Sequence, residues 1–205
     1  MTKKIYRLTK ISLMAALLCV ISPFAIVFPF SPVPISLTTL MLYLSVYILG
    51  KRDAVISCGI YLLIGLIGIP VFSGFSGGIG KVLGPTGGYM LGYLALTFIS
   101  GWFVDKCNGR RKNSVSTDED SCYALLENRA EIWLAFFMQG IGMVFGTVVC
   151  YLFGSLWLAY QAGMNFKAAL GVGAIPFIPG DVVKIVIGVA AGNAVRKRLV
   201  KAGVV

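Results

Sequence analysis

The stretch EIWLAFFMQGIGMVFGTVVCYLFGS, residues 131–155, decides how this chain can fold. After Glu131 it holds no charged side chain, and aromatic and branched apolar residues dominate it. A helix needs about 20 such residues to cross the roughly 30 Å hydrocarbon core of a bilayer. The stretch therefore predicts a membrane-spanning helix rather than a helix of a water-soluble domain.

Further apolar runs of similar character flank this stretch on both sides. We expect the other spans at about 11–30, 35–50, 54–71, 85–104 and 175–195. The composition agrees, because the chain is 58% hydrophobic and only 13% charged, whereas a soluble domain is about a quarter charged. The predicted fold class is all-α: one membrane domain, residues 1–205, built as a bundle of six transmembrane helices.

The basic residues predict how this bundle is oriented. They gather in four segments that fall on one side of a six-span protein, and the other three loops hold only Lys81 and Lys167. Loops rich in Lys and Arg lie in the cytoplasm. We therefore expect both termini to be cytoplasmic, and we expect a polar cytoplasmic linker at about 105–130 between two three-span halves.

The composition argues against several other functions. The net charge of +10 would suit nucleic-acid binding only if the basic residues formed one face, but here they lie in short clusters between apolar runs. The chain has no His, and its five Cys include no CxxC pair. The sequence therefore predicts a lipid environment, no nucleic-acid partner, no metal site and no cofactor.

The densest glycine segment, residues 68–93, invites an enzymatic interpretation. It contains the Gly-x-Ser-x-Gly pattern of hydrolases around Ser76. That motif requires a His partner, which this chain lacks; a Ser76–Lys81 dyad is the remaining enzymatic alternative. We interpret the glycines as a tightly turned or re-entrant loop over a cavity, because glycine lets the backbone turn sharply and approach a ligand closely.

Two ionisable residues stand inside the last predicted span. Asp181 and Lys184 lie three residues apart in IPFIPGDVVKIVIG, residues 175–188, so they share one helix face. Pro179 and Gly180 suggest that a helix begins there, where the helix dipole favours a carboxylate. Charged groups within a span are costly and are candidate functional residues. The alternative is a structural ion pair that neutralises itself.

Three segments together resemble a known family: SPVPISLTTL (31–40), GIPVFSGFSGGIGKVLGPTGGYMLGY (68–93) and PFIPGDVVK (176–184). They are similar to the BioY family, the biotin-specific substrate-capture (S) components of energy-coupling factor (ECF) transporters. The resemblance covers nearly the whole chain. It implies a prokaryotic plasma-membrane protein that binds biotin near the outer face and has no catalytic activity of its own.

The resemblance also implies partners and a transport mechanism. An S component associates with a transmembrane coupling subunit and two cytoplasmic ATPase subunits. ATP hydrolysis then makes the S component topple in the membrane and release biotin inside. S components resemble one another in an AxxxA pattern of the first helix that docks on the coupling subunit. At this spacing the chain has Ser12/Ala16 and Ala15/Cys19, and we expect these residues to face that subunit.

The implied binding residues can be matched to the chemistry of biotin. Its ureido ring offers two N–H donors and one carbonyl acceptor. In the family the Asp and Lys of the matching motif contact the ligand, which assigns Asp181 and Lys184. A carboxylate accepts from the N–H groups and an ammonium donates to the carbonyl, and such charge-assisted bonds are the stronger class.

The rest of the ligand needs other partners. For the apolar thiophane ring and valeryl chain we expect walls made of Tyr43, Phe72, Tyr89 and Phe177. For the ligand carboxylate, the candidates are Lys81, Thr86 or backbone N–H groups of the glycine-rich segment.

Two other functions remain as alternatives. The first is an autonomous secondary transporter of a small organic anion, in which Asp181 couples transport to protons. The second is an intramembrane serine hydrolase that uses Ser76.

Overall fold

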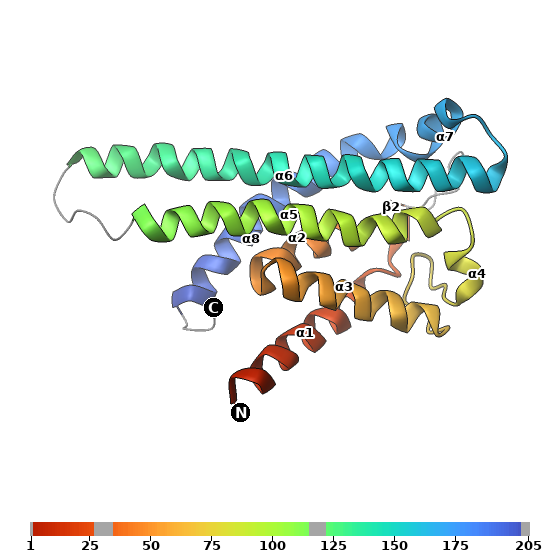
Figure 1. The fold of residues 1–205 in the computed structure, drawn as a ribbon, viewed down its shortest axis with the longest axis horizontal. Coiled ribbons are helices and arrows are strands. Elements are labelled where there is room, and N and C mark those ends of the chain that lie inside the picture. Colours follow the sequence, from red (N-terminus) through yellow and green to blue (C-terminus); the bar gives the residue numbers. More distant parts are fainter. Residues whose placement is uncertain (1, 27–34, 115–121, 202–205) are drawn as a thin grey trace.

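The computed structural model describes residues 2–26, 35–114 and 122–201 (Figure 1). These residues form a bundle of helices with one short antiparallel strand pair, so the predicted all-α class is confirmed. The elements are α1 (Thr2–Ile21), β1 (Ala25–Ile26), β2 (Ile35–Ser36), α2 (Thr38–Leu49), α3 (Lys51–Leu66), α4 (Ile79–Val82), α5 (Gly87–Ser114), α6 (Cys122–Ala162), α7 (Phe166–Gly173), the 3₁₀ helix η1 (Ile175–Phe177) and α8 (Ile178–Lys201).

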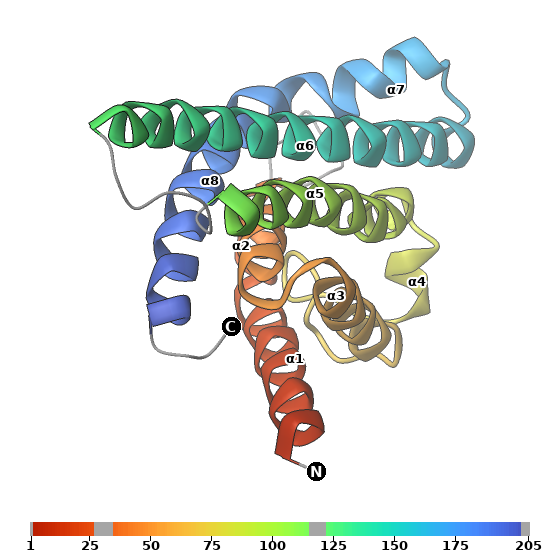
Figure 2. The same ribbon diagram turned by 60° about the vertical axis from the view of Figure 1, so that its left-hand side comes forward.

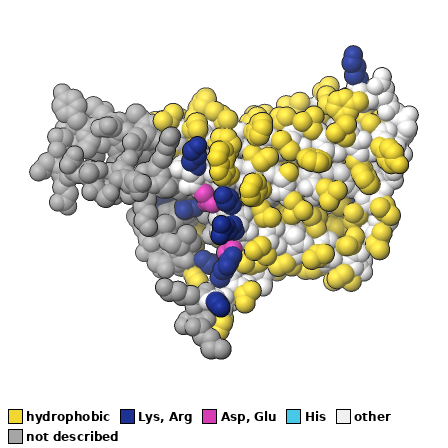
Figure 3. Space-filling view, viewed as in Figure 1, with side chains coloured by type: hydrophobic (Ala, Val, Ile, Leu, Met, Phe, Trp, Pro, Cys, Tyr) yellow, Lys and Arg dark blue, Asp and Glu magenta, His cyan; other side chains and the backbone are white. Residues whose placement is uncertain are grey.

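Within the described residues, three helical stretches are long and apolar enough to cross a membrane: Gly87–Cys107, Trp133–Ala162 and Phe166–Leu199. Helix α2 is apolar but has only 12 residues. Large apolar side chains lie exposed over most of the surface, as the space-filling view shows (Figure 3). This is the surface that a lipid environment requires. The count of six spans stays a prediction.

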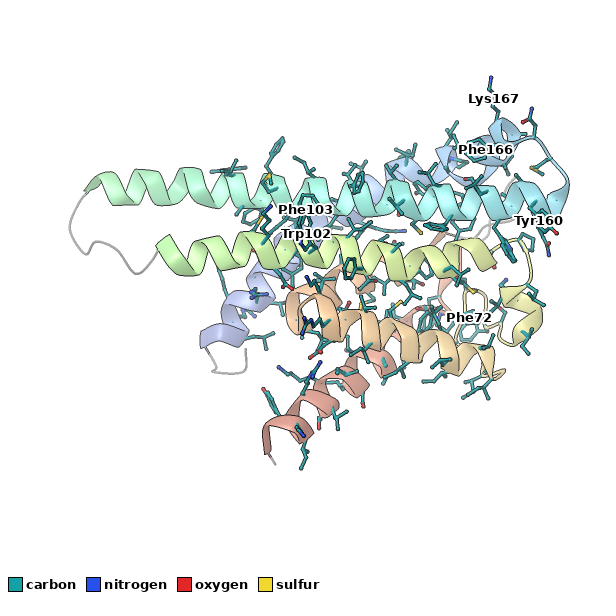
Figure 4. The ribbon with its side chains drawn as sticks, viewed as in Figure 1. Phe72, Trp102, Phe103, Tyr160, Phe166 and Lys167 are labelled. Atoms are coloured by element: carbon teal, nitrogen blue, oxygen red, sulfur yellow. The ribbon has the colours of Figure 1, made fainter. Side chains whose placement is uncertain are left out.

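Charged side chains gather at one end of the apolar surface (Figure 3). Helix α1 begins and α8 ends at this end, where α2 also turns into α3 (Figures 1 and 2). Lys167 projects from α7 at the opposite end (Figure 4). The start of α1, the end of α8 and the α2–α3 turn thus share one side; that this side is cytoplasmic, as the positive-inside rule expects, stays a prediction.

The first helix differs from the predicted span at 11–30. It runs from Thr2 to Ile21 and then turns at Ser22 and Pro23, because the residue before a proline is disfavoured in helical geometry. The chain then forms the strand pair, in which Ala25 lies opposite Ser36. Residues 31–34 of the segment SPVPISLTTL lie outside the described residues.

The predicted polar linker at 105–130 is helical over its described part. Helix α5 continues to Ser114 and α6 begins at Cys122; residues 115–121 are not described. Polar sequence does not end a helix, because Lys and Arg are good helix formers and the backbone hydrogen bonds are internal. The 41 residues of α6 correspond to about 60 Å of helix. Hydropathy therefore indicates where the membrane ends, not where the helix ends.

Glycines let α5 and α6 pack closely along most of their length. A Cβ added at Gly92 would lie 2.8 Å from Cys150 Sγ, and one added at Gly142 would lie 2.4 Å from Phe103 Cβ. The two helices run side by side in both ribbon views (Figures 1 and 2). Small residues at helix interfaces allow such close approach in membranes, where packing replaces the hydrophobic effect as the main driving force.

Buried polar contacts fix α8 against α2 and α6. The Tyr47 hydroxyl donates to Gln139 Oε1 over 3.0 Å, and Asn193 Nδ2 donates to the same oxygen over 2.8 Å. Nearer to the site, an added Cβ at Gly188 would lie 3.2 Å from Tyr43 Cβ. Hydrogen bonds between helices are favourable in lipid because no water competes for them. The two hydrogen bonds to Gln139 and the close approach at Gly188 together set the position of α8, and with it the position of the charged residues near its start.

A pair of leucine substitutions on α6 tests the glycine packing. We expect Gly142→Leu to lower stability by at least about 2 kcal/mol through overpacking. Gly140→Leu is the matched control, because a Cβ there meets nothing within 4 Å, and it should leave stability unchanged or slightly higher. Thermal unfolding in detergent measures both. Equal melting temperatures for the two variants would contradict the proposed packing.

Candidate functional site

The site is built at a break in a long apolar helical stretch. Helix α7 ends at Gly173, Ala174 leaves helical geometry with φ −127° and ψ −51°, and η1 leads into α8. Pro176 in η1 has no N–H to continue the ladder of hydrogen bonds. Broken helices at membrane depth are tolerated where they line a cavity. Here the break brings Gly173 and Phe177 to the wall of a cavity.

This cavity is narrow, with a volume of about 50 Å³. Its walls come from β2 and α2, from the first turns of α5, from the middle of α6, and from the α7–α8 break. Helices remote in sequence therefore meet around it. Hydroxyl and charged groups occupy part of the wall, and aromatic rings occupy the rest.

Asp181 and Lys184 supply the charges of the cavity. Lys184 Nζ lies 2.9 Å from Asp181 Oδ1, and the two side chains are only 12% and 9% exposed. The other carboxylate oxygen, Oδ2, accepts a hydrogen bond from the hydroxyl of Tyr151 on α6. Asp181 lies in the first turn of α8, where the helix dipole stabilises a negative charge. Both carboxylate oxygens are thus engaged by donors from two helices.

The aromatic wall is held in place by its own hydrogen bonds. The hydroxyl of Tyr89 donates to the carbonyl oxygen of Gly173 over 2.8 Å, which ties α5 to the end of α7. Tyr89 and Phe177 are both buried and pack with Tyr151 in one cluster. These contacts join α5, α6 and the α7–α8 break on the side of the cavity where the backbone changes direction.

The structure brings four of the eight predicted binding residues to the cavity. Asp181, Lys184, Tyr89 and Phe177 line it. Tyr43 lies behind it: its hydroxyl is 2.6 Å from Oγ1 of Thr147, which does line the cavity. The predicted ion pair and part of the predicted aromatic wall therefore share one site, and their role in binding stays a prediction.

The other three predicted residues lie away from the cavity wall. Phe72 is fully buried in the core, where its ring packs edge-on against Tyr61 at a centroid distance of 5.6 Å (Figure 4). Lys81 lies on the short helix α4 and Thr86 just before α5. Thr86 Oγ1 is buried, with no hydrogen-bond partner among the residues that the structure describes. These residues were predicted from their side-chain chemistry and their place in the glycine-rich segment. Neither property shows whether a side chain lines the cavity or lies elsewhere in the bundle.

Several cavity residues were missed from the sequence. Thr147 and Tyr151 lie within apolar runs, and no local pattern marks them, because their partners are on other helices. Tyr93 is the last residue of the motif at 68–93, which also carries the family resemblance, so a signal for it existed. Ser36 and Thr39 lie within the motif at 31–40 that carries the family resemblance, so a signal for these two existed. Thr39 Oγ1 is buried and makes no hydrogen bond within the described part of the chain, which leaves it available to a ligand.

The glycine-rich segment is tightly turned, as predicted. Gly74, Phe75 and Gly78 have positive φ angles of 77°, 53° and 88°. The hydroxyl of Ser76 donates to the carbonyl oxygen of Ser73 over 2.9 Å within this turn. The Gly-x-Ser-x-Gly pattern is thus explained by the turn.

The predicted docking residues on α1 point in different directions. Ser12 and Ala16 are exposed, Cys19 is half-buried, and Ala15 is buried at 2% exposure. A buried side chain does not reach a partner protein. Of the two predicted pairs, Ser12/Ala16 is therefore the exposed one, and its role in docking stays a prediction, whereas Ala15 belongs to the packing of α1 within the bundle.

Comparison with known proteins identifies one family. The family model of the BioY family matches residues 1–201. The biotin transporter BioY2 of Lactococcus lactis is 31% identical, over 96% of this chain and 93% of that protein. The biotin transporter BioY of Rhizobium etli is 35% identical, over 81% and 79%. A crystal structure of the S-component for biotin from an ECF-type ABC transporter matches with a TM-score of 0.75 at 28% identity, over 96% of this chain and 93% of that one.

The ion pair can be tested by a double-mutant cycle. We expect Asp181→Asn or Lys184→Met alone to destabilise the fold by about 3 kcal/mol, because each leaves a buried charge without its partner. The double variant should lose much less than the sum of the two. Equilibrium unfolding in SDS measures this, and additive losses would argue against direct coupling of the two charges.

Proposed function

The chain belongs to the BioY family, and we propose on this basis that it is the biotin-binding S component of an ECF-type importer. It is a multi-pass protein of the prokaryotic plasma membrane, and it is a transporter component rather than an enzyme. The observation that carries the proposal is the largely buried Asp181–Lys184 pair, which lines a cavity with aromatic walls at the break between α7 and α8. Charged groups at such a position need a polar ligand or each other.

The chemistry of the pair fits the ureido ring. Asp181 accepts from the ring N–H groups, and Lys184 donates to the ring carbonyl. Both bonds are charge-assisted, which makes them stronger than neutral hydrogen bonds. Tyr89 and Phe177 provide apolar surface for the thiophane ring. The hydroxyl of Thr39, which has no hydrogen-bond partner among the described residues, provides one further polar contact.

Binding exchanges one set of contacts for another. The cavity of about 50 Å³ is much smaller than the roughly 300 Å³ of the smallest usual ligand sites. The ligand therefore enters as side chains move apart. Lys184 leaves Asp181 Oδ1 for the ligand carbonyl, and a ligand N–H takes its place. Tyr151 keeps its bond to Oδ2 and holds the carboxylate in orientation during this exchange.

Transport then depends on partners that supply the energy. We propose a transmembrane coupling subunit and two cytoplasmic ATPase subunits, with the exposed Ser12/Ala16 face of α1 as the docking surface. Small residues on an exposed helix face allow close approach of a partner helix. No nucleotide-binding motif was found in this sequence, which is consistent with energy supplied by other subunits.

Biotin titration tests the binding role of the pair. We expect Asp181→Asn and Lys184→Ala each to weaken binding by about 1.5–3 kcal/mol, which is roughly a tenfold to hundredfold rise in Kd. Isothermal titration of the purified protein measures this. Asp53→Asn is the matched control, because Asp53 pairs with Arg7 between α1 and α3 instead, and it should bind biotin normally. A folded Asp181→Asn/Lys184→Met variant with unchanged affinity would refute the proposal.

A single substitution on α1 separates docking from binding. We expect Ala16→Leu to abolish biotin uptake in cells, because the larger side chain prevents close contact with the coupling subunit, while biotin binding by the purified protein is retained. Ala168→Leu on α7 adds the same side chain at another exposed alanine and should leave both intact. Lost binding in Ala16→Leu would refute the docking assignment.

Uptake by the protein alone in liposomes, driven by a pH gradient, would favour the secondary transporter.

A further inference from the structure

A second cavity lies on the outside of the bundle, where α6 and α8 cross. It is an open groove of about 470 Å³. Both ribbon views show α8 diverging from α6 toward its C-terminal end (Figures 1 and 2). Asn193 on α8 still reaches Gln139 on α6, and the groove lies beside this contact, where the side chains of the two helices do not fill the space between them.

The described residues that line the groove are all apolar. Trp133, Phe137 and Val186 form exposed walls, at 74%, 73% and 63% exposure. Gly140 and Ala190 are the small residues along it, and a Cβ at Gly140 would meet nothing within 4 Å. A groove without polar groups, on a surface that faces hydrocarbon, suits a flexible hydrocarbon chain.

Basic residues lie further along α8, beyond the end of the groove. Helix α8 runs back toward the end of the bundle where α6 begins (Figure 1), and Trp133 near the start of the α6 span lines the groove together with Val189 and Ala190. Seven residues beyond Ala190, about two turns along α8, the same exposed face carries Lys197 and Arg198. Trp together with Lys and Arg is typical of the membrane–water interface. The apolar groove thus ends at the depth where phospholipid headgroups lie.

We propose that this groove binds an anionic phospholipid. One acyl chain lies between α6 and α8 against Phe137 and Gly140, and the phosphate pairs with Lys197 and Arg198. Charge complementarity favours an anionic lipid over a zwitterionic one, because basic residues near a bilayer surface attract anionic headgroups. The site is separate from the cavity around Asp181 and is independent of the function proposed for it.

Fluorescence quenching by brominated lipids tests this site. The protein is placed in vesicles that contain phosphatidylglycerol or phosphatidylcholine with brominated acyl chains at equal mole fraction. The Trp133 signal is obtained as the difference from a Trp133→Phe variant. We expect brominated phosphatidylglycerol to quench Trp133 more strongly than brominated phosphatidylcholine does. In Lys197→Gln/Arg198→Gln the relative affinity for phosphatidylglycerol should fall by about fivefold for each charge removed.

Matched variants separate groove binding from general effects. Gly140→Leu fills the groove and should abolish the preference, whereas Gly59→Leu on α3, where a Cβ also meets nothing within 4 Å, should keep it. Lys4→Gln/Arg52→Gln removes two exposed charges elsewhere and should also keep it. Equal quenching by both lipids would overturn the proposal, as would a preference that survives Lys197→Gln/Arg198→Gln. Absence of quenching by either lipid would mean that a second copy or another subunit covers the groove, and would overturn it as well.

Discussion

The ion pair between Asp181 and Lys184 is the constraint on which the site depends. At 2.9 Å, with both side chains nearly buried, each charge is acceptable in this environment only because the other is present. The pair needs the first turn of α8 to begin at this depth, and the break after α7 provides that turn. The hydroxyl of Tyr151 then links the pair to α6.

The remainder of the bundle holds this arrangement in place. Glycines bring α5 against α6, which places Tyr89 and Tyr151 around one cavity. The hydrogen bonds of Gln139 with Tyr47 and Asn193 fix α8 against α2 and α6 further along. In hydrocarbon, where apolar surfaces gain little by meeting each other, close packing and a few polar contacts determine which helices associate. Beside the Asn193–Gln139 contact, α6 and α8 carry apolar residues, and a groove remains open between the two helices.

Part of the site could be predicted because it depends on local sequence. Asp181 and Lys184 are conspicuous in an apolar span, and Phe177 precedes them by a few residues. Tyr151 and Thr147 could not be predicted, since the sequence around an aromatic or hydroxyl residue in a span does not show which residue on another helix it contacts. Phe72 was misplaced for a related reason: a ring in a glycine-rich turn is apolar whether it lines a cavity or fills the core, and here it packs on Tyr61.

The sequence by itself determined the all-helical class, the membrane environment and the shared side of the basic segments, because these depend on hydropathy summed along short segments. It did not determine where helices end: Pro23 stops α1 early, and α6 continues far beyond its apolar run. Only the tertiary structure decided which side of α1 is exposed and which residues face Asp181. These properties arise from contacts between helices remote in sequence, whose packing angles follow from side chains on both partners together.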